Sequence, residues 1–100
     1  MDKIFIASPI IDKDFEIYQN ELTKRAKVAE LLVGHELELI QTWIPQDTRN
    51  PYNKLAVLSK LIFLLSQADY VYFVDGWRQS DDCRILHECA VRYGLNILND

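Results

Sequence analysis

The chain has 100 residues, of which 49% are hydrophobic, and its formal net charge at pH 7 is −4. This length and composition suffice for one hydrophobic core, so we expect a single domain spanning residues 1–100. The negative charge gives no electrostatic reason to expect nucleic acid or an anionic membrane as a partner.

The cysteines and the start of the chain limit the class of protein further. Cys83 and Cys89 lie six residues apart on one predicted helix, too far apart for an easy disulfide and without a CxxC motif or a histidine at zinc spacing. We therefore expect reduced thiols, no metal site and no cofactor. Met1-Asp2-Lys3 leads directly into a strand-like segment, and no run of about 20 apolar residues follows. These features predict a cytoplasmic protein without a membrane span.

The first half of the chain predicts a buried strand, a long helix and an edge strand. Lys3–Ala7 is nearly continuously apolar, as a strand covered on both faces requires, and the proline in Ser8-Pro9-Ile10 ends it. Apolar residues then recur at steps of three and four, which predicts an amphipathic helix from Phe15 to Val33 that ends at Gly34. The alternation in Glu36–Gln41 is typical of a strand with one wet face, and therefore of an edge.

The second half begins with a loop. Residues Thr42 to Asn53 lose periodicity and contain Trp43, Pro45 and Pro51. Two interpretations have equal weight: a functional loop, or a surface connection with Trp43 packed against the core.

Two further helices and two strands follow the loop. Lys54–Gln67 has a broad apolar face and predicts a second helix packed on the sheet. Tyr70–Asp75 predicts a buried strand, after which Ser80, with Asp81 and Asp82, caps a third helix. Gly94 ends that helix before a last strand at Asn96–Leu98.

This alternation of strands and helices predicts an α/β fold in three layers. Without hairpin signals, four parallel strands and three helices form one sheet with helices on both faces, and we expect the strand order 2-1-3-4. The switch point then falls between the first and third strands, where open α/β sheets bind ligands. The residues expected to line or border this crevice are Ser8, Pro9, Ile10, Trp43, Asp75, Gly76, Trp77, Ser80 and Arg84.

The sequence gives little support for a phosphate site or a nucleophilic triad at such a crevice. Three glycines form neither GxGxxG nor a P-loop, and Asp81 and Asp82 would repel a phosphate at the start of the third helix. Ser8 has no positioned histidine for a nucleophilic triad. We expect His87 and Glu88 to be solvated helix residues.

Some of these residues also resemble a known family. The strings Lys3–Ile10, Gly34-His35-Glu36 and Asp69–Trp77, followed by Ser80, Arg84 and Ala90–Gly94, resemble the nucleoside 2-deoxyribosyltransferase-like proteins, and most closely their short relatives of unassigned function. The resemblance covers nearly the whole chain. It implies a flavodoxin-like or Rossmann-like fold and a nucleoside-sized pocket.

The catalytic members of that family use a helix glutamate as nucleophile and an aspartate on the preceding helix to assist proton transfer. Counted from Gly94, the glutamate position is Leu86 here, and counted from Asp69, the aspartate position is Leu61. Glu88 lies about 200° round the helix from position 86 and cannot substitute without a local shift. The resemblance therefore implies an apolar pocket floor and no confident catalytic residue.

These observations predict a nucleoside- or nucleotide-like small-molecule binding or regulatory module. Two alternatives stay open: an enzyme acting on an N-glycosidic bond, and a structural component of a homo-oligomer. A homo-oligomer is also expected because relatives assemble, and because Trp77, Trp43 and Tyr52 could cover a subunit face. The same aromatic side chains could instead stack on a base.

Overall fold

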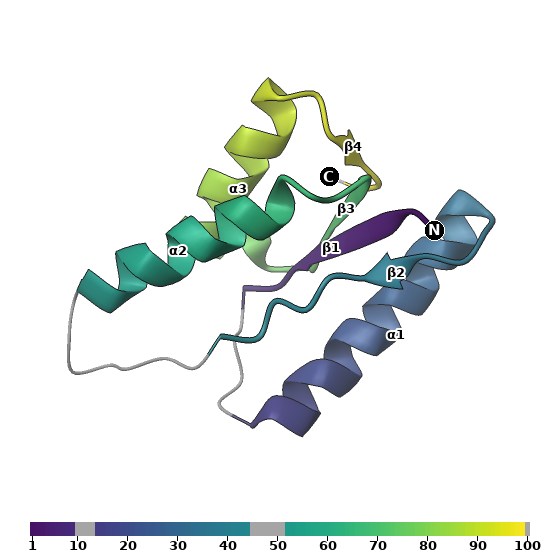
Figure 1. Cartoon of the computed structure of the whole chain (residues 1–100), viewed down its shortest axis with the longest axis horizontal. Coiled ribbons are helices and arrows are strands. Elements are labelled where there is room, and N and C mark those ends of the chain that lie inside the picture. The colour runs from purple at the N-terminus through teal and green to yellow at the C-terminus, as the bar shows by residue number, and fades with distance from the viewer. Residues whose placement is uncertain (10–13, 45–51, 100) are drawn as a thin grey trace.

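The protein is a three-layer α/β sandwich of the flavodoxin-like or Rossmann-like kind (Figure 1). The computed structural model describes residues 1–9, 14–44 and 52–99, without the side chains of Tyr52 and Asn53. The elements follow the chain as β1 (Lys3–Ala7), α1 (Phe15–Val33), β2 (Glu38–Leu39), α2 (Tyr52–Leu65), β3 (Tyr70–Phe73), the 3₁₀ turn η1 (Trp77–Gln79), α3 (Asp81–Arg92) and β4 (Asn96–Ile97).

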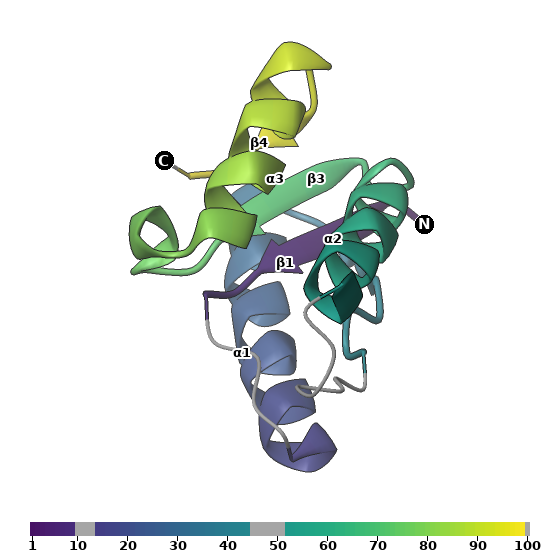
Figure 2. The same cartoon turned by 90° about the vertical axis from the view of Figure 1, so that its left-hand side faces the viewer.

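The sheet is parallel throughout and has the predicted order β2-β1-β3-β4. β2 lies on one side of β1, and β3 and β4 lie on the other side. Connections of one hand then place the helices on opposite faces. Accordingly, α1 covers one face while α2 and α3 cover the other (Figures 1 and 2).

The side chains of β1 divide the interior into two cores. Ile4 and Ile6 pack against Tyr18, Leu22, Ala26 and Ala29 of α1. Phe5 and Ala7 point to the other face, where they join the apolar residues of α2, β3 and α3. All four β1 side chains are at most 2% exposed, so the strand is buried on both faces as predicted.

Caps define the ends of the helices. The Asp14 side chain accepts hydrogen bonds from the backbone N–H groups of Glu16 and Ile17 at 2.9 and 3.2 Å, which starts α1. Gly34 ends the same helix with φ 91°, a left-handed conformation that favours glycine. Ser80 caps α3 by accepting from Cys83 N, as the sequence predicts.

The predicted element boundaries need correction in four places. The second strand covers only Glu38–Leu39, the two residues that pair with β1, and Leu37 N before it donates to the Glu30 carboxylate of α1 at 2.8 Å. The third strand ends at Phe73 and not at Asp75, because Val74 and Gly76 accept the hydrogen bonds that form η1. The last strand ends at Ile97, and α2 runs from Tyr52 to Leu65 where Lys54–Gln67 was expected.

A pair of leucines on α1 tests the burial of this helix. Leu22 is 1% exposed and Leu31 is 84% exposed, so the same truncation removes core contacts at one site only. We expect Leu22→Ala to lower the free energy of unfolding by about 2–5 kcal/mol. Leu31→Ala should change it by less than about 0.5 kcal/mol. Urea denaturation measures both, and equal losses would show that this face of α1 is not packed on the sheet.

Candidate functional site

A crevice with two chambers lies at the carboxyl ends of β1 and β3, at the predicted switch point. Ser8, Pro9 and Tyr18 line both chambers. We call one the leucine chamber, with a volume of about 50 Å³, because Leu61 and Leu86 line it. We call the other the arginine chamber, about 270 Å³, because it lies along α1 beside Arg25. Together they reach the lower end of the usual range for small-molecule sites, roughly 300–1,000 Å³.

The floor of the leucine chamber is apolar. Phe5 of β1, Leu61 of α2 and Leu86 of α3 meet there, and each is at most 5% exposed. Leu61 and Leu86 are the two positions that the family resemblance assigns to catalytic acids, and they lie in one chamber. A floor of this kind neither donates a proton nor carries negative charge.

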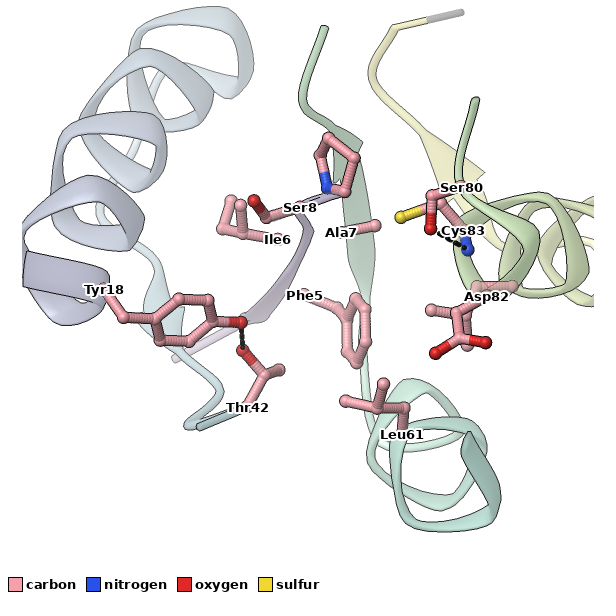
Figure 3. A pocket seen from close by; sticks show the side chains of 12 residues that line it. Phe5, Ile6, Ala7, Ser8, Tyr18, Thr42, Leu61, Ser80, Asp82 and Cys83 are labelled. Carbon is pink, nitrogen blue, oxygen red and sulfur yellow. Dashed lines mark hydrogen bonds between the residues drawn. The ribbon is translucent and has the colours of Figure 1, made fainter. Parts of the chain in front are cut away.

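The polar groups of the leucine chamber stand on two sides of Phe5 (Figure 3). On one side, Tyr18 Oη and Thr42 Oγ1 share a buried hydrogen bond of 2.8 Å. On the other, Ser80, Asp82 and Cys83 come from the start of α3. Among the described residues, Asp82 is the only carboxylate that lines this chamber.

Two weak acids of this chamber are held neutral. Burial raises the pKa of the Cys83 thiol, partly offset by its hydrogen bond with Ser80, and the Asp82 charge raises it further. Burial also raises the pKa of Tyr18, with the Thr42 hydrogen bond acting in the opposite direction. Both groups can therefore take part in hydrogen bonds at neutral pH without carrying charge.

The arginine chamber is bordered by more charged residues than the leucine chamber. It lies between α1 and the end of β3 and is bordered by Glu21, Arg25 and Asp75. Arg25 Nε is buried and, within the part of the chain that the structure describes, has no hydrogen-bond partner. A buried donor without a partner is costly, and the Arg25 side chain that carries it borders the chamber.

The structure brings five of the predicted site residues together. Ser8 and Pro9 line both chambers, Ser80 lines the leucine chamber and Asp75 lines the arginine chamber. Gly76 borders them, since a Cβ at this position would lie 3.7 Å from Pro9 Cγ and its φ of 92° favours glycine. Ile10 lies outside the described residues.

Three other predicted residues lie elsewhere. Trp77 is only 8% exposed, with its ring tilted against Phe73 and stacked on His87 at 4.3 Å, so it belongs to the core. Trp43 is partly buried against the core on the α1 side and contacts Phe15 with ring centroids 5.3 Å apart, while residues 45–51 of the loop lie outside the described residues. Arg84 lies on the outer face of α3, where it pairs with Asp81.

The expectation of a solvated His87 is also corrected. Its ring is partly buried between Phe73, at 5.0 Å, and Trp77. Glu88, in contrast, is exposed on the outer face of α3 and accepts a hydrogen bond from Arg92 at 2.5 Å. It faces away from the leucine chamber and does not replace the missing acids.

Sequence reasoning missed Tyr18, Thr42 and Arg25. Tyr18 belongs to the apolar stripe of α1, which predicts a core residue, although its hydroxyl lies where β1 ends. Thr42 directly follows the predicted strand Glu36–Gln41, and a polar residue at the end of a strand was a usable signal. Arg25 looked like part of the solvated face of α1, because the burial of its Nε depends on the packing of its side chain in the folded chain.

Residues 1–9, 14–44 and 52–99 were also compared with the requirements of a metal site and of a membrane span. No group of three or more histidine, cysteine or acidic side chains in these ranges is placed to hold a metal ion. No helix within them is both long and apolar enough to cross a membrane.

Comparison with known proteins adds no family assignment. No protein-family model matches the chain, and no curated protein matches it either. The fold and the crevice therefore define the class to which the protein can be assigned: a small flavodoxin-like α/β domain with a two-chambered cavity at its switch point.

The raised pKa of Cys83 predicts a loss of stability in alkali. Its folded pKa exceeds the unfolded value, so the neutral thiol's contribution is fully present below pH 9.0 and is lost as the pH rises through the folded pKa. We expect the free energy of unfolding, measured in urea between pH 7 and 10, to fall above pH 9.0. Cys83→Ala should flatten this fall and the control Cys89→Ala should not. An identical fall in wild type and Cys83→Ala would contradict this prediction.

Proposed function

We propose that the protein binds a nucleoside-like small molecule in the crevice at the carboxyl end of β1 and leaves its glycosidic bond intact. The observation that carries this proposal is the composition of the leucine chamber, whose floor is Leu61 and Leu86. It sits at the position where flavodoxin-like sheets bind ligands.

The size of the chambers suggests how such a ligand would lie. The leucine chamber holds a few water molecules and is too small for a base. The arginine chamber is large enough for a ring, with Pro9, Ile17 and Val74 as apolar walls. A base in the arginine chamber would direct its sugar toward Ser8 and the leucine chamber.

Hydrogen-bonding groups of the crevice match a polar, uncharged ligand. The Arg25 guanidinium, which borders the arginine chamber, offers donors to a carbonyl or ring nitrogen of a base. Asp75 and Glu21 offer acceptors to amino groups or sugar hydroxyls. Two acids beside one arginine disfavour a polyphosphate, which needs an excess of positive charge.

The chemistry of glycosidic-bond cleavage argues for binding without reaction. A departing base needs a proton and the oxocarbenium-like sugar needs a carboxylate on its other side, so two placed acids are required. The described part of the leucine chamber has the single carboxylate of Asp82. Tyr18 and Cys83 stay neutral there and supply no negative group at neutral pH.

Arg25 gives the sharpest test of binding. Nucleosides should raise the melting temperature of the wild type in a thermal-shift screen. Arg25→Met removes the buried donor, and we expect at least a tenfold loss of affinity, about 1.4 kcal/mol. Lys24→Met is the matched control, since it removes the same charge from the neighbouring, exposed position of α1, and should bind as the wild type does. Equal losses in both variants, or no shift with any nucleoside, would contradict the proposal.

Chromatography of the same mixtures tests the absence of catalysis. We expect no free base above a control without protein. Base release that Asp82→Asn abolishes, while Asp81→Asn retains it, would instead favour an N-glycosidic-bond enzyme with Asp82 as its acting carboxylate. The two variants remove the same charge from the first turn of α3, and only Asp82 lines the leucine chamber.

A further inference from the structure

The outer face of α3 carries four charged residues in alternating order. Asp81, Arg84, Glu88 and Arg92 project within about 80° of one another on a helix of roughly 100° per residue. Their side chains are 58–83% exposed and are paired along the helix, Arg84 with Asp81 and Arg92 with Glu88. The face is therefore neutral, although the chain as a whole carries a charge of −4.

This order is complementary to itself when two helices run antiparallel. Read from the N-terminus it is negative, positive, negative, positive, and read from the C-terminus it is the reverse. A two-fold axis level with residue 86 sets Arg84 opposite Glu88 of a second copy. The same two-fold axis brings Asp81 level with residue 91 of the second copy. Asp81 is therefore one residue, or about 1.5 Å along the helix, from that copy's Arg92. A parallel arrangement would set every charge against its like.

Apolar surface borders this charged column. Ile85 is 41% exposed, and Cys89 lies next to it on the same face. Cys89 also lines a groove of about 560 Å³ between α2 and α3, whose other walls include Ile62 and Tyr93, 37% and 83% exposed. A contiguous apolar groove beside self-complementary charges is typical of an association surface.

A dimer interface of ordinary size would take about a tenth of the surface of the chain. A specific interface needs about 500–800 Å² from each copy, and the chain exposes 6563 Å². Helices α2 and α3 lie next to each other on the side of the molecule that faces the viewer in Figure 2. Residues of both helices line the groove.

The other two helices do not have this property. In α1 the exposed charged residues Glu16, Glu21, Lys24 and Lys27 are spread over about 140° around the helix, so they form no single charged column. In α2 the two charged residues, Lys54 and Lys60, are both basic.

We propose that the protein forms a homodimer in which α3 packs antiparallel against α3 of a second copy across a two-fold axis. Each ion pair between copies, Arg84 to Glu88 and Asp81 to Arg92, occurs twice in such an isologous interface. The apolar groove beside Cys89 is covered by the second copy. The four charged residues of the interface line neither chamber, so this proposal stands independently of the proposed function.

Charge reversal at one pair tests the proposal with the full chain. Sedimentation velocity over a range of concentrations should show a monomer–dimer equilibrium for the wild type. Glu88→Arg sets arginine against arginine twice, and Arg84→Glu sets glutamate against glutamate twice. Each variant alone should raise the dimer dissociation constant about tenfold or more. Lys27→Glu, which reverses an exposed charge on α1 that lines neither chamber, is the control and should dimerise like the wild type.

Mixing the two variants is the decisive step. The Glu88→Arg copy carries arginine at both positions of the pair, and the Arg84→Glu copy carries glutamate at both. In an antiparallel mixed dimer each arginine therefore meets a glutamate, so the equimolar mixture should regain dimers. Circular dichroism verifies that each variant is folded. The proposal is overturned if the wild type stays monomeric at all concentrations, if Glu88→Arg dimerises as well as the wild type, or if the mixture stays monomeric.

Discussion

Burial of β1 on both faces is the constraint on which the rest of the structure depends. A strand whose alternate side chains must all leave water needs a helical layer on each side, and this chain provides α1 for one face and α2 with α3 for the other. The chain must therefore add β2 on one side of β1, and then β3 and β4 on the other side. That change of side opens the crevice next to Ser8 and Pro9, since the connections after β1 and β3 leave toward opposite faces.

The same packing decides the chemistry of the crevice. Phe5, directed toward α2 and α3, meets Leu61 and Leu86, and these three side chains belong to the continuous core of that face. Acids at these two leucine positions would place charge beside Phe5, at a cost that only a bound partner or a functional need offsets. In this protein the hydrophobic core continues to the chamber floor. The polar side chains of Tyr18, Thr42 and Asp82 lie around that floor.

The regular part of the fold could be predicted from sequence because its signals are periodic. The apolar run of β1, the stripe of α1 and the Gly34 cap correctly give the strand, the helix and its end. The short extent of β2 could not be predicted, since the alternation of Glu36–Gln41 continues beyond the two residues that pair with β1. Trp77 was misplaced because the position of its ring depends on the η1 turn, which inserts it against Phe73 and His87. Side-chain contacts across elements, such as Tyr18 with Thr42, have no local signature.

Leucine-methyl NMR with an added nucleoside tests the central claim most directly, because it reports the binding position and the fate of the ligand in one sample. Binding in the crevice predicts that the methyl signals of Leu61 and Leu86 shift with saturation, while those of the exposed Leu31 and Leu55 stay in place. It also predicts that the anomeric proton signal of the nucleoside persists. Unchanged Leu61 and Leu86 methyls at high nucleoside concentration, or conversion of the nucleoside to free base, would contradict it.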